Sequence, residues 1–129
     1  MKYSTCPKCN TKKPVSEFKK HKLAKSGICW CVSCANEASR VWLVQLKLEV
    51  ITALGGKCAH CAEADIDVLT VDHIDQQGSA HRLANRLASG WKTFIWLKRN
   101  SYPEGFRVLC FNCNTKAYRN WLRQQKETQ

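Results

Sequence analysis

Four pairs of cysteines with the spacing Cys-x-x-Cys constrain this chain more than any other feature. A Cys-x-x-Cys hairpin lets two sulfurs approach one ion, and two such hairpins complete the closed tetrahedral site of structural zinc. The four pairs therefore predict two structural Zn²⁺ ions. In sequence order, the first ion would be held by Cys6, Cys9, Cys31 and Cys34, and the second by Cys58, Cys61, Cys110 and Cys113.

Pairing in sequence order is favoured because a long stretch with its own predicted strands separates the last two hairpins; interleaved pairing is the alternative. Thioredoxin-like redox chemistry is a second alternative, but it normally uses one Cys-x-x-Cys rather than four. The ninth cysteine, Cys29, fits neither hairpin and is expected to be a free, partly buried thiol. His21 and His60 are expected to be solvated side chains rather than ligands.

The chain's length and location also favour metal over disulfides. In 129 residues, units of about 60 residues bury too little surface to be stable without staples. The opening segment, residues 1–6, shows no apolar leader, and no run approaches the ~18 apolar residues of a membrane span. We therefore expect a cytoplasmic protein with no membrane partner, a compartment in which paired thiols more often hold metal.

The formal net charge of the chain is +11. Eight zinc-bound thiolates would contribute −8 and two zinc ions +4, which leaves about +7. A short chain this basic is expected to bind a polyanion, since each neutralised phosphate releases condensed counterions. A merely solubilising surface is the alternative.

The pattern along the chain predicts a small, zinc-stapled α+β protein in three parts. Residues 1–34 are expected to form a zinc ribbon, residues 35–54 a linking helix without Gly or Pro, and residues 55–129 a second zinc-containing domain. Beyond the recurring Cys-x-x-Cys, the sequence shows no internal repeat. In the last part we expect strands at 68–74 and 106–109, turns at 76–79 and 101–105, helices over 81–99 broken near Ser89 and Gly90, and a final helix at 114–124.

Apolar side chains at helical spacing suggest which helix faces are buried. Leu83, Leu87, Trp91, Ile95 and Trp96 are expected to be core contacts, and the aromatic residues among them, with Phe94 and Trp121, are favoured as core rather than base-stacking platforms.

Three polar residues between the last two hairpins suggest catalysis. Asp72 and His73 lie in a predicted strand, whose successive side chains point to opposite faces, and Asn114 directly follows a zinc hairpin. Carboxylate and amide oxygens suit Mg²⁺, while a neutral imidazole can take a proton from water. A surface Asp-His pair and an Asn helix cap are the structural alternatives.

The order of these motifs resembles a known family. Cys58-Ala59-His60-Cys61, then Val71-Asp72-His73-Ile74, then Leu109-Cys110-Phe111-Asn112-Cys113-Asn114 is similar to the zinc-containing HNH endonucleases found widely in phages and to the recombination endonuclease VII family. The resemblance covers residues 55–123. The N-terminal cysteines separately resemble the short zinc ribbons that phage HNH proteins often carry. The insert before Phe106 is longer than in the endonuclease VII pattern.

The resemblance implies a ββα-metal (HNH) nuclease core preceded by a zinc ribbon and a linking helix. It also implies DNA cleavage that depends on a catalytic Mg²⁺ or Mn²⁺, with His73 as general base and Asp72 and Asn114 as cation ligands. His81 is a further candidate at the site, with a structural role as the alternative. Asn100 and Asn112 are candidates for the middle Asn of the motif.

DNA is the expected partner, with RNA as an alternative polyanion, and the host cytoplasm is the expected location if a phage encodes the protein. Competing functions are a non-catalytic zinc-finger protein that binds DNA or RNA and a branched-DNA resolvase. The oligomeric state, a dimer included, stays open. Phosphate contacts are expected from Lys116, Arg119 and Arg123 of the final helix, and a second basic surface from Lys12, Lys13, Lys19, Lys20, Lys22 and Lys25 of the ribbon.

Overall fold

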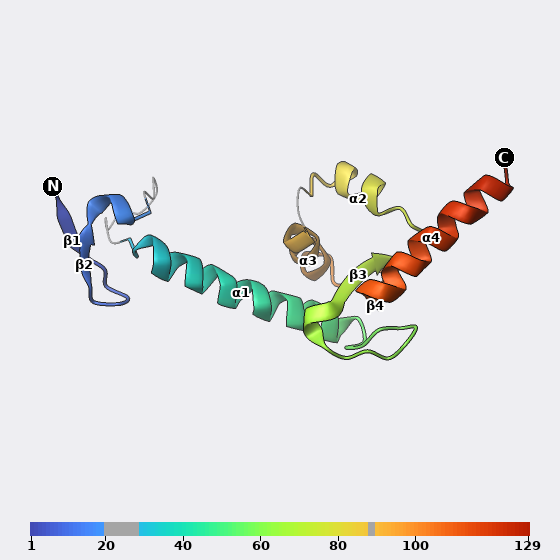
Figure 1. The fold of residues 1–129 in the computed structure, drawn as a ribbon, viewed down its shortest axis with the longest axis horizontal. Helices are drawn as coiled ribbons and strands as arrows, with labels where there is room; N and C mark the ends of the chain where they lie inside the picture. The colour runs from blue at the N-terminus through green and yellow to red at the C-terminus, as the bar shows by residue number, and fades with distance from the viewer. Residues whose placement is uncertain (20–28, 88–89) are drawn as a thin grey trace. The chain divides into compact units, whose positions relative to one another are not determined.

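The computed structural model describes residues 1–19, 29–87 and 90–129 (Figure 1). Over these residues the chain is a small α+β protein with four α-helices and two antiparallel sheets of two strands each. It divides into two compact units, Met1–Val44 and Gln45–Gln129, which we call the N-terminal and C-terminal units. Helix α1, Val32–Ala53, runs from the first unit into the second. None of the helices in the described part combines the length and the apolar character that crossing a bilayer requires.

The N-terminal unit has almost no core apart from its cysteines. Strands β1 (Tyr3–Thr5) and β2 (Lys12–Pro14) pair antiparallel and are followed by a 3₁₀ turn, Val15–Glu17. In residues 1–19 and 29–44, the only fully buried side chains are Cys6 and Cys31. A two-stranded hairpin is at best marginally stable by itself, so the cysteine cluster must hold this unit together.

The C-terminal unit is built on a second strand pair. Strands β3 (Leu69–His73) and β4 (Phe106–Cys110) are antiparallel, with a register that runs from Leu69 opposite Cys110 to His73 opposite Phe106. Helix α4 (Phe111–Glu127) follows β4 directly and packs against both strands. A 3₁₀ turn, Ile66–Val68, precedes β3, and the connection from β3 to β4 carries helices α2 (Gly78–Ala84) and α3 (Gly90–Arg99).

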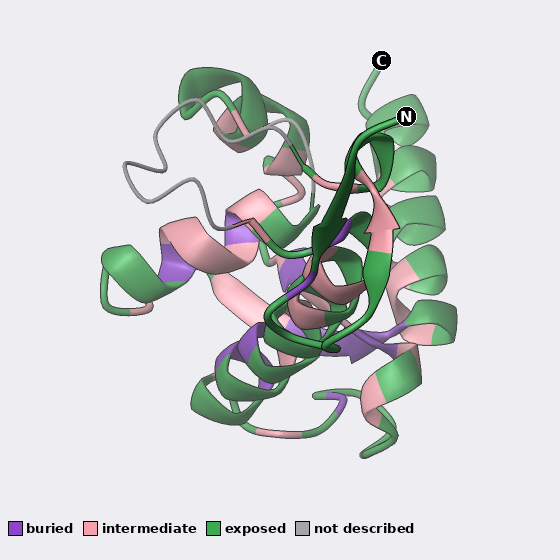
Figure 2. Ribbon diagram, turned by 90° about the vertical axis from the view of Figure 1, so that its left-hand side faces the viewer, coloured by how far each residue is buried: buried purple, intermediate pink, exposed green. Residues whose placement is uncertain are grey.

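Two adjoining clusters form the core of this unit, and Figure 2 shows them as the buried segments of the strands and helices. The first centres on Ile51, Leu69, Val108 and Leu109, together with Cys58 and Cys110. The second joins Leu46 and Val50 of α1 to Leu97 of α3. The end of α1 is thus an integral part of the C-terminal unit.

The two units repeat one local arrangement around their cysteines. The amide of Asn10 donates to the Cys6 carbonyl at 2.8 Å, and the amide of Ala62 donates to the Cys58 carbonyl at 3.0 Å. Both donors have a positive φ, 56° and 62°. In each unit the first cysteine of the second hairpin pairs antiparallel with a distant residue, and the hairpin then opens a helix. Cys31 forms an isolated β-bridge with Phe18, and Cys110 pairs with Leu69 of β3. This repeat was not recognised in the sequence because the intervening segments differ in length.

Most predicted elements are confirmed, with corrected ends. Helix α1 begins at Val32 rather than 35, and α4 begins at Phe111 rather than 114, because in both cases the second cysteine hairpin is itself the first helical turn. Helix α2 begins at Gly78 rather than 81, so the predicted turn at 76–79 is shorter, with a positive φ at Gln76. Ser89, where a helix break was expected, lies outside the described residues.

The predicted core of α2 and α3 is wrong in two places. Leu83 is 83% exposed and Trp91 is 41% exposed, whereas Leu97 is fully buried. Leu83 lies two positions after His81, which turns it about 200° around the helix axis to the opposite face. Because His81 occupies the packed face of this short helix, Leu83 is left in solvent.

Candidate functional site

The eight hairpin cysteines form two groups in the pairing predicted. In each group the four sulfur atoms lie within 4.8 Å of one another: Cys6, Cys9, Cys31 and Cys34 in the first, and Cys58, Cys61, Cys110 and Cys113 in the second. This donor set and spacing fit a structural zinc site, so each group could hold one Zn²⁺. Cys29 is half-buried and belongs to neither group, as expected.

Electrostatics within each group favour a cation. A hydrogen bond with the Ser33 hydroxyl lowers the pKa of Cys31 to about 6, while the hydrogen bond with Cys31 raises the pKa of Cys34 to about 12. In the second group, burial of Cys58 is outweighed by backbone hydrogen bonds that lower its pKa to about 6, and the bond with Cys110 raises the pKa of Cys113 to about 12. Sulfurs this close cannot all be thiolates without a bound positive ion.

Lys13 belongs to the first cysteine group rather than to a free basic surface. Its ammonium lies 3.5 Å from the Cys31 sulfur and 3.2 Å from the Ser33 hydroxyl, and the bond with Cys31 raises the pKa of Lys13. Of the other lysines predicted to form the basic surface of the ribbon, Lys12 lies over the Tyr3 ring. Lys20, Lys22 and Lys25, and also His21, lie outside the described residues.

A polar cavity of about 450 Å³ opens beside the strand pair of the C-terminal unit. Its lining includes His73 from the end of β3, Arg82 from α2, Thr93 from α3 and Asn114 from the first turn of α4. Cys110 caps α4, with its sulfur accepting from the Cys113 amide. Asn114 is therefore inside the helix and is not the N-cap, which removes one structural explanation for it.

His73 is half-buried and closely packed. Burial lowers its pKa, and the nearby His81 and Arg82 lower it further against the opposing effect of Asp72 and Asp75. The imidazole is thus biased toward its neutral form. Its ring lies against the first turn of α2, where a Cβ placed on Gly78 would be 3.0 Å from Nδ1. Its Nε2 atom is buried and has no hydrogen-bond partner among the described residues.

Asp72 points to different surroundings from His73, as the alternation of a strand predicts. It is 6% exposed and does not line the cavity; one carboxylate oxygen accepts a hydrogen bond from Nε of Arg107 at 2.8 Å. A second Arg107 nitrogen lies 3.3 Å from Nε2 of His60, which is exposed as predicted. The structure brings His73 and Asn114 to one cavity, and it places Asp72 in an ion pair behind the strand.

His81 packs in an aromatic group next to the cavity. Its ring centroid lies 4.9 Å from that of His73, 4.3 Å from that of Trp96 and 5.4 Å from that of Phe106. Both of its ring nitrogens are buried, and neither has a hydrogen-bond partner in the part of the chain that the structure describes. This packing places His81 behind the His73 ring and away from the cavity lining.

The remaining sequence candidates lie outside the cavity. Lys116, Arg119 and Arg123 are exposed on α4, with Arg123 also donating to Asn120 at 3.2 Å. Asn100 donates to the Trp96 carbonyl at 2.8 Å, and Asn112 is exposed. Neither of these asparagines lines the cavity.

Two residues of the site were missed in the sequence. Arg82 lines the cavity, and its position immediately after His81 could have suggested it. Arg107 holds Asp72 from the opposite strand, and only the register of β3 against β4 reveals that pair.

Comparison with family models, curated proteins and solved structures finds no match for this chain. Any function must therefore be argued from the geometry of the site itself.

Proposed function

We propose that the C-terminal unit is a metal-dependent endonuclease of the HNH (ββα-metal) type that hydrolyses DNA phosphodiester bonds. One observation carries the proposal: a neutral-leaning imidazole, a guanidinium and an amide, from His73, Arg82 and Asn114, share one polar cavity. They come from three different elements around a strand pair followed by a helix. A base, an anion-binding group and a hard oxygen donor are what phosphodiester hydrolysis requires.

In this proposal His73 removes a proton from the attacking water. A neutral imidazole is able to do so, and its packing against Gly78 fixes the ring. Arg82 binds the phosphate oxygens, because a guanidinium matches their geometry and keeps its charge. Lys116, Arg119 and Arg123 bind flanking phosphates and so position the strand.

The residues present fit a divalent cation. Asn114 offers an amide oxygen to the cavity, and Asp72 keeps a second carboxylate oxygen beyond the one bound to Arg107. Because Asp72 does not line this cavity, it would have to turn its free oxygen away from the ion pair with Arg107 to bind the same cation, directly or through one of the waters that Mg²⁺ keeps. When bound, Mg²⁺ or Mn²⁺ would offset the charge that develops on the phosphate and on the departing oxygen.

Nicking of a supercoiled plasmid by the zinc-loaded protein, with and without added Mg²⁺ or Mn²⁺, tests the proposal. The His73→Ala variant should lose about 10²- to 10⁴-fold in rate while its zinc content and unfolding midpoint stay unchanged. Asn114→Ala should also lose activity. The matched control Asn112→Ala, two positions earlier on the same helix and exposed, should cut like the parent. A His73→Ala protein that cuts at the parent rate would exclude this mechanism.

The ion pair between Asp72 and Arg107 favours one other function, a non-catalytic zinc protein that binds nucleic acid. In that case Asp72 serves only the fold, and the cavity binds phosphate without cleaving it. Salt-sensitive DNA binding without cleavage under any metal would favour this alternative.

A further inference from the structure

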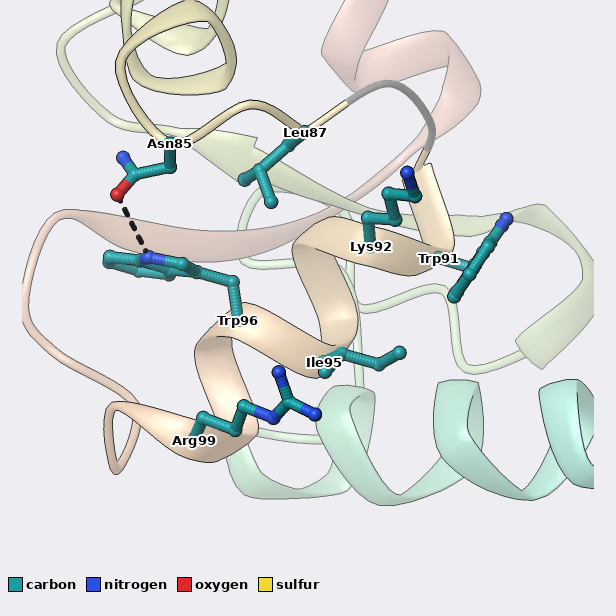
Figure 3. Close-up of a pocket in the computed structure, with 7 residues that line it drawn as sticks. All are labelled: Asn85, Leu87, Trp91, Lys92, Ile95, Trp96 and Arg99. Carbon is teal, nitrogen blue, oxygen red and sulfur yellow. Dashed lines mark hydrogen bonds between the residues drawn. The ribbon is translucent and has the colours of Figure 1, made fainter. Parts of the chain in front are cut away.

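The C-terminal unit has a second cavity, of about 320 Å³, whose lining residues are drawn in Figure 3. Helix α3 supplies most of its lining: Trp91, Lys92, Ile95, Trp96 and Arg99. Leu87, from the chain that precedes this helix, lines both this cavity and the polar one that contains His73. The two cavities therefore share a wall.

The two tryptophans of this cavity differ in how they are held. The indole N–H of Trp96 donates to Oδ1 of Asn85 at 3.1 Å, and the amide nitrogen of Asn85 donates to the His81 carbonyl at 3.0 Å. Trp96 also packs edge-on against the His81 ring, so its orientation is set before any ligand arrives. Trp91 is 41% exposed, with Lys92 over its ring at 5.8 Å.

The charge of the lining selects the ligand. Among the described residues that line it, Lys92 and Arg99 are the ionisable ones, both cationic, and none is acidic. A ligand that suits this cavity has a flat aromatic part, which can pack on the indoles and on the aliphatic side chains of Leu87 and Ile95. It also carries a negative charge, which the two cations attract. A nucleotide has both, since every base offers a π-face and every linkage a phosphate.

We propose that this cavity binds one unpaired base of the substrate strand, next to the bond that is cut. The inference deepens and rests on the proposed function, and it names the substrate class: DNA with an unpaired nucleotide beside the scissile phosphate. Trp96 touches the His81 ring, and that ring touches His73, so the base site lies two ring contacts from the proposed general base. A base paired within a duplex could not reach the indoles without leaving its stack.

Equilibrium binding tests this inference independently of cleavage. Full-length, zinc-loaded protein carrying His73→Ala, which prevents cutting, is titrated into fluorescent single-stranded oligothymidylate. A parallel titration uses an abasic oligomer of the same length and therefore the same number of phosphates. Adding Trp91→Ala should weaken oligothymidylate binding roughly tenfold and leave the abasic affinity unchanged, since one base–aromatic contact is lost. Trp91→Phe should retain most of the affinity.

Trp42→Ala is the matched control, because Trp42 is exposed to a similar extent (47%) but lies outside this cavity. It should change neither affinity, and all variants should keep the parent's helicity and zinc content. The inference is overturned if Trp91→Ala leaves oligothymidylate binding unchanged or weakens both oligomers equally. Base-dependent binding by a protein that cuts no DNA would instead overturn the proposed function and leave the base site standing.

Discussion

At the scale of single residues, Asp72 and His73 follow one another in β3 but face different surroundings. His73 lines the polar cavity, whereas Asp72 is buried against Arg107. The Arg107 side chain is 24% exposed and that of Asp72 only 7%, so this pair is largely shielded from water. For a shielded ion pair, removing one partner leaves a buried, unpaired charge, and the free-energy cost of that charge exceeds the net stabilisation from forming the pair.

Replacing Arg107 is therefore expected to destabilise the C-terminal unit strongly. Arg107→Met should lower the free energy of unfolding by about 3 to 5 kcal/mol, because it leaves the buried Asp72 carboxylate without its cationic partner. Urea unfolding of the zinc-loaded protein, followed by circular dichroism, measures this change. Asp72→Asn in the Arg107→Met background should recover part of the loss. An Arg107→Met protein that unfolds at the parent's urea concentration would show that the pair does not hold the strand.

At the scale of elements, α2 holds the ring of the proposed base in place. Gly78 begins this helix, and a Cβ added there would be 3.0 Å from Nδ1 of His73 and 3.3 Å from an Arg82 nitrogen. The Arg82 group ends a flexible side chain and can move, but the His73 ring is packed against Phe106 and His81. An added methyl group must therefore push the imidazole or the helix start.

Gly78→Ala is expected to separate activity from stability. The cleavage rate should fall about 10- to 100-fold because the imidazole of His73, the proposed general base, is displaced. The free energy of unfolding should change by no more than about 1 kcal/mol, because the better helix propensity of Ala offsets the cost of displacing the packed ring. Plasmid nicking and urea unfolding measure the two quantities. Gly90→Ala is the matched control. Gly90 begins α3 and lines the polar cavity that contains His73, yet a Cβ there meets no described atom within 4 Å. Parental activity in Gly78→Ala would refute the contact.

Elements with a strong local signal could be predicted from the sequence, and those set by distant partners could not. The β-branched run before His73 predicted β3, and the stretch without Gly or Pro predicted α1. Helical spacing alone does not say which face is buried. Leu97 is buried because Leu46 and Val50 of α1 cover it, which the sequence of α3 does not reveal. Likewise, His73 and Asn114 could be proposed as site residues, but the grouping with Arg82 required the fold.

At the scale of the whole molecule, one cysteine arrangement is used twice with different support around it. In the C-terminal unit the second cysteine group adjoins a core that contains Ile51, Leu69 and Leu109. In the N-terminal unit, within residues 1–19 and 29–44, no side chain other than Cys6 and Cys31 is fully buried. Zinc bound to these groups would therefore supply nearly all of the folding free energy of the N-terminal unit but only a part of it in the C-terminal unit.

Single cysteine replacements should consequently have different effects in the two units. Cys110→Ser loosens the start of α4, which carries Asn114, so it should abolish plasmid nicking, while the apolar core keeps much of the unit's helicity. Cys6→Ser should unfold the N-terminal strands and weaken DNA binding with a smaller salt dependence, because fewer cations then contact phosphate, but some nicking should remain at high protein concentration. Each variant should lose about one of the two zinc ions, measured by metal analysis. The hypothesis is that zinc alone holds the N-terminal unit, whereas zinc in the C-terminal unit positions the catalytic residues. Complete unfolding of both variants, or full activity in Cys110→Ser, would contradict it.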